Sequence, residues 1–450
     1  MAPSSANITI LFLFCSMCLA VPAYSASTAP TISHQPTQLA TLLVGGLCLT
    51  TAAALTLAWA SWRRQRTGCI RPAQPGGVCQ GVLGAIGNTP LIRIASLSDA
   101  TGCEILGKAE MLNPGGSVKD RVALQIVTEA MAEGRLLPGG LITEGTAGST
   151  GVSLAMVAAA VGCHCFIAMP DDAAIEKVQV LQALGAEVQR VRPVSITHPE
   201  HHVNVARRKA LAVQAAAEAA ATSTPSASPS TPPCASSAIP TSHFSSAIFA
   251  DQFENLANQR AHFVTGAEIW AQTHGRLHAF VSGAGTGGTL AGVSRILKAR
   301  NSGIRVFLID PPGSSLYNKV ERGVLYARVE AEGTRLRHPF DTITEGIGIN
   351  RLTLNFQQAA VDSAFTGSDR EAVEMAAYLL RNDGLFVGSS AAMNCVGAVK
   401  AARRLGPGHT VVTILCDGGA RHLSKFHNPE YLRQMGLLPC HSGKALEFVS

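Results

Sequence analysis

The stretch HAFVSGAGTGGTLAGVSRILKAR, residues 278–300, decides the fold class, because it runs from a short strand through a glycine-rich joint into a helix. Gly283, Gly285 and Gly288 satisfy the G-x-G-x-x-G spacing of dinucleotide-binding loops. The run RVFLID follows and ends in Asp310, about where an acid that binds a nucleotide ribose would lie. Such a joint suits an anion, because backbone N–H groups converge on a partly positive helix N-terminus. The pattern alone leaves open whether that anion belongs to NAD or is another phosphate.

The same alternation of strand and helix repeats from about residue 82 onward. Short runs rich in β-branched residues alternate with alanine-rich helical runs, with glycine-rich joints between them. This alternation is typical of βα units, so we predict an α/β fold of parallel sheets flanked by helices. We expect strands at 103–112, 140–145, 163–170, 277–285, 304–311 and 410–419, and helices at 117–134, 151–162, 268–275, 289–300, 369–383 and 393–405.

The length and charge of the chain limit its class. Its 450 residues exceed the ~250–300 at which single cores stop growing, so we expect one catalytic region of two subdomains. The net charge is +6, but charged residues make up only 15% and the basic ones are scattered, which excludes a nucleic-acid-binding face. The context of the 12 cysteines favours reduced, buried thiols. Histidines and cysteines at 163–165 and 198–202 are interpreted as core and solvated loop, so no metal site is expected.

The first 62 residues contain no Lys, Arg, Asp or Glu. This composition excludes an ordinary globular surface and an Arg-rich mitochondrial presequence. We interpret residues 1–36 as a hydrophobic or targeting segment. Residues 37–62 supply the roughly 20 apolar residues that a bilayer requires and are predicted to be a transmembrane helix. The basic run RRQR opens a linker at 63–81 and predicts, by the positive-inside rule, a catalytic region that faces the cytosol. We expect an anchor in the mitochondrial outer membrane, with the endoplasmic reticulum as the alternative.

One tract interrupts the α/β pattern. Residues 215–246 consist mainly of Ala, Ser, Thr and Pro, with hardly a charge and no periodic apolar face. Such a tract cannot bury enough surface to order itself, so we predict a disordered surface insertion.

A second strand-to-helix joint, EGTAGSTGVSLA at 144–155, combines glycines with hydroxyl groups that suit a carboxylate or a phosphate. Neither joint carries the Gly-Lys-Ser/Thr ending of a Walker A loop, which excludes that class of nucleotide site. Two such joints indicate either one large ligand or a cofactor beside an anionic substrate.

The run NPGGSVKDR, residues 113–121, puts Lys119 in the first turn of a helix, with Ser117 as its N-cap. The helix macrodipole disfavours a cation there by about 0.3–1 kcal/mol and lowers its pKa. A lysine that forms a Schiff base has to become a neutral amine, so the position suits that chemistry. Taken alone, Lys119 is also compatible with a solvated first-turn residue.

Two hydroxyl residues, Ser389 and Ser390, stand between a short apolar strand and a helix in GLFVGSSAAMNCVGA, residues 384–398. Hydroxyl groups at such a joint commonly cap the helix. They can also offer a neutral hydrogen bond to a ring nitrogen.

In order and wording these segments resemble the fold type II pyridoxal-phosphate enzymes, and within them the cysteine synthase and cystathionine β-synthase group. The resemblance covers about residues 82–430 outside the 215–246 tract and is strongest for the membrane-anchored fungal branch. The motifs that carry it are IGNTPLIRI (86–94), NPGGSVKDR, EGTAGSTGVSLA, DQFENLANQRAHFVTGAEIW (251–270), SGAGTGGTLAGVSR (282–295), TEGIGIN (344–350) and CDGGARHLSKF (416–426).

This resemblance implies a two-domain fold like that of the tryptophan synthase β chain over residues 82–435. A smaller mobile subdomain would occupy about 122–192, and residues 436–450 would form a C-terminal tail. The family also implies a homodimer.

Pyridoxal 5'-phosphate is the cofactor that the resemblance implies, so the glycine joint would hold a phosphate monoester rather than NAD. Lys119 would be the Schiff-base lysine and the proton shuttle at the substrate Cα, and Ser390 would face the pyridine nitrogen. The cofactor phosphate would be bound by Gly285, Thr286, Gly287, Gly288 and Thr289, and the substrate carboxylate by Thr146, Ala147, Gly148, Ser149 and Thr150, with Ser149 also next to the cofactor.

The implied reaction replaces the activated β-substituent of O-acetyl-L-serine with sulfide and gives L-cysteine. A serine does not keep the ring nitrogen protonated, so the cofactor is a weaker electron sink and prompt loss of the β-substituent is favoured. Two features depart from the family: Ser149 replaces the usual Asn, and GSSAAM replaces G-I-S-S-G-A. The alternatives are a cystathionine β-synthase-like enzyme, a serine or threonine dehydratase, and a cofactor-binding protein that has lost turnover.

Overall fold

The structure is a computed structural model that describes residues 77–146, 148–171, 173, 175–222, 244–327 and 342–450. The segment at 1–36, the predicted transmembrane helix at 37–62 and most of the 63–81 linker lie outside these residues. Among the helices that are described, none combines the length and the apolar character needed to cross a bilayer.

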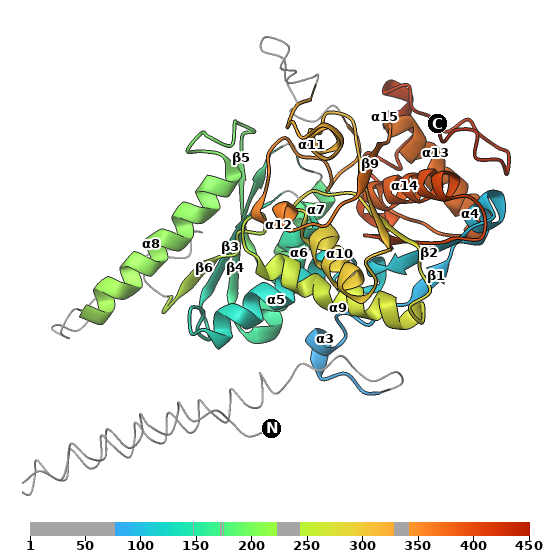
Figure 1. Ribbon diagram of the computed structural model, residues 1–450. Helices are drawn as coiled ribbons and strands as arrows, with labels where there is room; N and C mark the ends of the chain where they lie inside the picture. The colour runs from blue at the N-terminus through green and yellow to red at the C-terminus, as the bar shows by residue number, and fades with distance from the viewer. Residues whose placement is uncertain (1–76, 147, 172, 174, 223–243, 328–341) are drawn as a thin grey trace, which may run out of the picture. The chain divides into compact units, whose positions relative to one another are not determined.

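The larger of two sheets confirms the predicted α/β class. Its strands follow the order β1-β2-β10-β7-β8-β9, and all neighbours run parallel except β1 and β2 (Figure 1). The strands are β1 (Leu91–Arg93), β2 (Glu104–Ala109), β7 (Ala279–Ser282), β8 (Arg305–Asp310), β9 (Ser363–Thr366) and β10 (Thr410–Leu415).

The smaller sheet is entirely parallel, in the order β5-β4-β3-β6. Its fourth strand comes from residues well past 192, the predicted limit of the small subdomain, so this sheet draws on a longer part of the chain. The strands are β3 (Leu141–Gly145), β4 (His164–Pro170), β5 (Glu187–Val191) and β6 (Ala247–Phe249).

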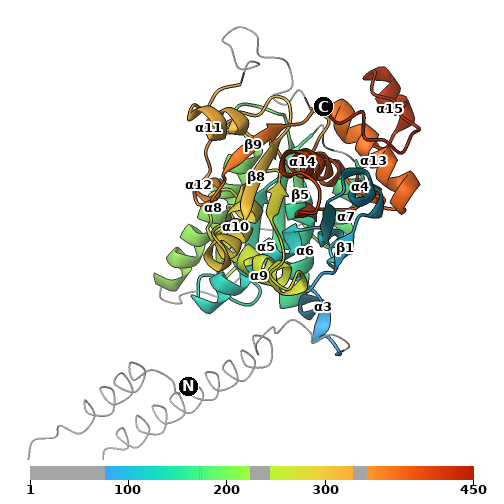
Figure 2. The same cartoon turned by 45° about the vertical axis from the view of Figure 1, so that its right-hand side comes forward.

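Helices cover both faces of the larger sheet (Figure 2). On β7, Val281 packs in the core with α13 and α14, whereas the adjacent Phe280 points to the opposite core with α9 and α10. The helices that match predictions are α5 (Lys119–Ala132), α6 (Ser149–Val161), α10 (Gly288–Arg300), α13 (Asp369–Asp383) and α14 (Ser389–Leu405). Helix α9 (Ala257–Gln272) overlaps the predicted helix at 268–275 only in its last residues and begins 11 residues earlier. The others are α3 (Gly81–Gly84), α4 (Ala95–Thr101), α7 (Ile175–Ala183), α8 (His202–Thr222), α11 (Leu316–Arg322), α12 (Leu354–Gln357) and α15 (Pro429–Gln434).

Helix α8 corrects the start of the predicted disordered insertion, because residues 215–222 are helical. Ala206 and Val213 pack against the smaller sheet and anchor the first half of the helix. The alanines that follow have the highest intrinsic helix propensity, so the helix continues beyond its buried stretch. Residues 223–243 of the tract lie outside the described part of the chain.

The C-terminal tail, residues 436–450, packs against α13 and the hydrophobic core beside it. Glu374 of α13 is buried, and its carboxylate accepts hydrogen bonds from the N–H groups of Cys440 at 2.8 Å and His441 at 3.1 Å. Leu446 and Val449 are buried in the same hydrophobic core. The tail therefore completes both the packing and the polar contacts of α13.

A buried group of four charges, termed here the ion cluster, joins β2, α5 and α9. Arg121 of α5 pairs with Glu110 at 2.8 Å and with Glu268 of α9 at 2.8 Å. Lys108 of β2 pairs with Glu268 at 2.6 Å. Thr89, within the NTPL motif, donates its hydroxyl hydrogen to Glu110 at 2.7 Å. Removing one partner from such a cluster leaves an uncompensated buried charge.

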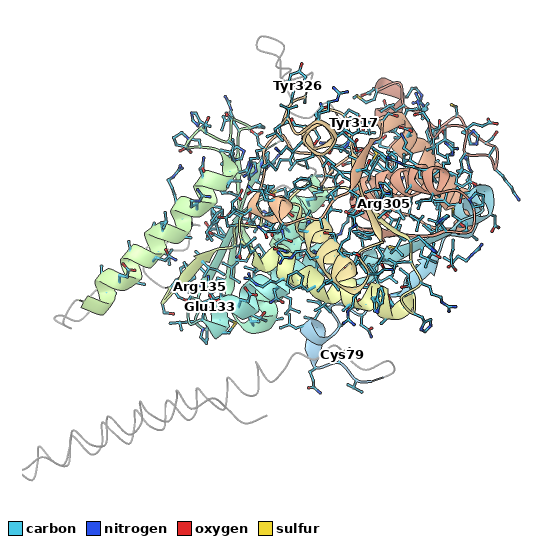
Figure 3. All side chains as sticks on the ribbon, in the orientation of Figure 1. Cys79, Glu133, Arg135, Arg305, Tyr317 and Tyr326 are labelled. Carbon is cyan, nitrogen blue, oxygen red and sulfur yellow. The ribbon has the colours of Figure 1, made fainter. Side chains whose placement is uncertain are left out.

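Replacing Arg121 by alanine should therefore lower the free energy of unfolding by about 3–5 kcal/mol, because Glu110 and Glu268 would remain buried without their cation. The matched control is Arg135→Ala, which removes an exposed pair with Glu133 just beyond α5 (Figure 3) and should cost less than about 1 kcal/mol. Urea denaturation followed by circular dichroism measures both values. Equal losses in the two variants would contradict a structural role for the ion cluster.

Candidate active site

Lys119 is the first residue of α5, and the chain before it is tied to the end of β10. The Val118 N–H donates to the Cys416 carbonyl oxygen at 2.9 Å, and Ser117 forms an isolated β-bridge with Asp417. The Ser117 hydroxyl oxygen accepts a hydrogen bond from the Lys119 N–H at 3.2 Å. Ser117 therefore supports the first turn, although the N-cap position itself belongs to Val118.

The pKa of the Lys119 amine is lowered, chiefly because burial removes its hydration, while nearby Cys416 and Asp417 partly oppose that effect. The direction agrees with the expectation from the helix position, but the main cause is burial rather than the macrodipole. A lowered pKa increases the share of neutral amine near neutral pH, which is the form that attacks an aldehyde or accepts a carbon-bound proton.

The joint between β7 and α10 requires glycine at several positions, because a Cβ there would collide with neighbouring atoms. Gly287 has φ +85°, a left-handed conformation that glycine adopts without strain. A Cβ on Gly288 would lie 2.0 Å from the side-chain oxygen of Asn258, and one on Gly285 would lie 2.4 Å from the Gly346 carbonyl oxygen. The first N–H groups of α10 have no partner within the helix, so they are available to an anion.

Hydroxyl groups add to this joint. Thr286 is buried, and its hydroxyl oxygen accepts a hydrogen bond from the Asn258 amide at 2.9 Å. The Thr289 hydroxyl lies 3.2 Å from His262 Nε2. Asn258 and His262 stand four residues apart on α9, so they share one helix face. Both residues lie in the 251–270 motif but are not among the predicted site residues, although their polar i, i+4 spacing is a signal that the sequence contains.

The predicted substrate loop joins β3 to α6. Thr146 and Thr150 are buried, and the Gly148 N–H donates to the Thr146 hydroxyl oxygen at 3.2 Å. The Thr150 hydroxyl donates to the side-chain oxygen of Gln252 at 2.6 Å, a partner that sequence reasoning missed. Ala147 lies outside the described residues.

Ser149 begins α6 and thus stands at a second helix N-terminus. A hydrogen bond connects this helix to α5, because the Ser153 hydroxyl donates to the carboxylate of Asp120 at 2.5 Å. Asp120 directly follows Lys119 in sequence. The start of α6 is thereby held close to the lysine.

The two serines before α14 have different partners. The Ser389 hydroxyl oxygen accepts a hydrogen bond from the Glu345 N–H at 3.0 Å. The Ser390 hydroxyl instead lies near the thiol of Cys416 and lowers its pKa against the larger effect of burial, and Cys416 is also an electrostatic neighbour of Lys119. Ser390 is therefore the one of the two whose hydroxyl group lies on the Lys119 side.

Asp310 takes no part in this arrangement of loops. It is buried at the end of β8, and its carboxylate accepts a hydrogen bond from the Tyr317 N–H at 2.7 Å. One oxygen of the carboxylate thus supports the start of α11.

The chemistry of the donors fits pyridoxal phosphate. A phosphate monoester requires several N–H and O–H donors, which the first turn of α10, Thr286 and Thr289 offer together. An aldehyde requires an amine that becomes neutral, and the buried Lys119 is such a group. The carboxylate of an amino-acid substrate requires a separate set of donors, and the start of α6 has them.

Comparison with known proteins agrees with this fit. A family model described as "Pyridoxal-phosphate dependent enzyme" matches residues 82–417. Cysteine synthase 2 of Schizosaccharomyces pombe is 50% identical over 367 residues, which cover 80% of this chain and 87% of that protein. The "Putative mitochondrial cysteine synthase" of Saccharomyces cerevisiae is 44% identical and covers 84% of this chain and 91% of its own length.

The fold is also found among solved structures. The crystal structure of the O-acetylserine dependent cystathionine beta-synthase from Helicobacter pylori matches with a TM-score of 0.62 and 29% identity, over 77% of this chain and 98% of that one. The family match spans both sheets and all of the loops described above. The chain therefore belongs to the pyridoxal-phosphate-dependent enzymes, and pyridoxal phosphate is its cofactor.

Proposed function

We propose that the protein is a cysteine synthase, a transferase that makes L-cysteine from O-acetyl-L-serine and sulfide. The observation that carries the proposal is the buried Lys119 amine with its lowered pKa. Asp120, the next residue, bonds Ser153 in the first turns of α6, and His262, which interacts electrostatically with Lys119, lies 3.2 Å from Thr289 at the start of α10. Relatives named cysteine synthase, at 44–50% identity over most of the chain, support the choice of reaction.

When bound, pyridoxal phosphate withdraws electrons from the substrate Cα and so weakens its Cα–H bond. Lys119 would hold the cofactor at rest and then accept and return the Cα proton. The first turn of α10, with Thr286 and Thr289, would bind the cofactor phosphate. The first turn of α6, with Thr146 and Thr150, would bind the substrate carboxylate.

Ser390 would give the pyridine nitrogen a neutral hydrogen-bonding partner. The neighbouring Cys416 thiol keeps its proton, because burial raises its pKa to about 12, so neither group supplies charge near neutral pH. A ring nitrogen without a charged partner withdraws less electron density, which favours rapid loss of a β-substituent over longer-lived carbanion chemistry.

A cystathionine β-synthase reaction, with homocysteine as the nucleophile, is the second candidate. It is favoured by Ser149, whose side chain is shorter than the Asn that the resemblance leads one to expect and leaves more room beside the substrate. The name of the Helicobacter pylori structure also joins O-acetylserine to that reaction.

For location, we propose that residues 37–62 anchor the protein in the mitochondrial outer membrane, with the catalytic region in the cytosol, and that the catalytic region forms a homodimer. The uncharged N-terminal segment and the basic run that follows it support the anchor. The name of the Saccharomyces cerevisiae relative supports the organelle.

A product assay should yield cysteine from O-acetylserine and sulfide, at a kcat/KM at least about tenfold above that for cystathionine formation from O-acetylserine and homocysteine. The same purified protein is offered serine and O-phosphoserine in parallel, and products are measured by mass spectrometry. Cystathionine as the main product would select the second candidate, and the absence of any sulfur-containing product would reject both.

Changing Lys119 to alanine should abolish the visible absorbance band of the lysine-bound cofactor and lower kcat by at least about 1,000-fold, because the variant lacks both the amine that holds the cofactor and the base at Cα. Lys444→Ala, at an exposed position, is the matched control and should retain band and activity. A Lys119 variant with the wild-type spectrum would exclude this lysine as the point of attachment.

Alkaline extraction of mitochondrial membranes should leave the full chain in the pellet, because a spanning helix is held by its apolar surface rather than by charge. A chain that begins at residue 63 should appear in the supernatant. Release of the full chain by alkali would contradict an integral anchor, and its recovery with endoplasmic reticulum markers would select the other membrane.

A further inference from the structure

The ionisable groups that interact electrostatically with Lys119 include Cys416, His262 and Asp417. Burial raises the pKa of the Cys416 thiol to about 12, so the thiol keeps its proton. Burial, together with the positive charges of Lys119 and Arg121, places the pKa of His262 well below its usual value, so that imidazole stays neutral. Asp417 is the carboxylate among the electrostatic neighbours of Lys119.

One carboxylate oxygen of Asp417 is unused. Asp417 follows β10, and its backbone is bridged to Ser117, two residues before Lys119. Its Oδ2 lies 3.0 Å from His422 Nε2, while the buried Oδ1 has no hydrogen-bond partner among the described residues. A Cβ on Gly388 would lie 2.1 Å from Oδ1 and 2.7 Å from His422 Nε2, so the pair requires glycine at that position.

The second nitrogen of His422 points toward another carboxylate. His422 Nδ1 lies 3.7 Å from Glu345 Oε2, and Glu345 also pairs with Lys177 of α7. The imidazole is buried, whereas the Glu345 side chain is 33% exposed. His427 is the other histidine beside it, and burial lowers its pKa, so it stays neutral and bonds the Val387 carbonyl oxygen. A line of groups therefore runs from Asp417 through His422 to a partly exposed carboxylate.

The proposed reaction releases a proton that Lys119 does not handle. Acetate leaves with the electron pair of the Cβ–O bond, and Lys119 takes the Cα proton and later returns it to Cα. An electron pair of hydrogen sulfide forms the S–Cβ bond, one proton stays on sulfur, and the other has to leave with its bonding electrons retained by sulfur. Hydrogen sulfide and O-acetylserine thus give cysteine, acetate and one proton.

We propose that Asp417 and His422 form the proton acceptor for the attacking sulfur, with Glu345 as the positioning residue that orients the imidazole and leads toward solvent. The proposal rests on the proposed function. The two ring nitrogens of His422 lie 3.0 Å from Asp417 Oδ2 and 3.7 Å from Glu345 Oε2, so the imidazole connects the two carboxylates. The open oxygen of Asp417 is the entry point, since its other oxygen is occupied by His422.

The test compares His422→Gln and Asp417→Asn with wild type across pH, using sulfide as the nucleophile. At a pH where hydrogen sulfide is neutral, kcat should fall by about 100-fold in both variants, with KM for O-acetylserine changed by less than about threefold. As rising pH converts hydrogen sulfide into HS⁻, no proton has to be accepted, so the defect should shrink to within about threefold. His164→Gln, an exposed histidine of β4, is the control and should follow wild type.

A second readout does not depend on turnover. The Nε2 signal of His422 in nitrogen-15 spectra of the intact protein should shift in Asp417→Asn, because the carboxylate oxygen that lies 3.0 Å from this nitrogen is replaced. A kcat defect that is constant across pH, or variants equal to wild type, would overturn the proposal even if the spectra change. A wild-type enzyme that makes no cysteine would instead refute the proposed function, so the two failures are distinguishable.

Discussion

The rest of the structure depends on one constraint: each buried charged side chain needs an oppositely charged partner next to it. In the ion cluster, Arg121 and Lys108 remain compatible with burial only while Glu110 and Glu268 stay within hydrogen-bonding distance. Because these residues come from β2, α5, α9 and the turn between β2 and α5, their pairing limits how those segments can meet. Lys119 lies two residues before Arg121, so the same pairing determines where the lysine stands.

Much of the fold could be predicted because the signals were local. The apolar run LHAFVS contains β7, and its residues alone indicate a strand. The glycines that follow it mark the start of α10. The sequence analysis did not predict β1, β5, β6 or β9, and β5 and β6 show how a strand can depend on its neighbours. Strand β5, EVQRV, is a half-exposed edge with no apolar run, and β6 has only three residues, so each becomes recognisable as a strand only beside its partner.

The candidate site divides in the same way. Lys119 and the glycine joint are visible in short motifs, whereas the groups that support them come from distant parts of the chain. Asn258 reaches Thr286 across 28 residues, and Gln252 reaches Thr150 across 102. Ser389 and Ser390 are distinguished in the structure by their neighbours, Glu345 for the first and Cys416 for the second, and neither neighbour is close in sequence. Even the lowered pKa of Lys119 had a cause, burial, that no local pattern contains.

The contacts of Glu374 have a consequence for biosynthesis. The N–H groups that satisfy this buried carboxylate belong to residues 66 and 67 positions further along the chain. While α13 leaves the ribosome, those partners have not yet been translated, and a carboxylate cannot stay buried without them. The core around α13 should therefore close late, and a translating ribosome that stalls before residue 440 would present an incomplete, hydrophobic surface to chaperones.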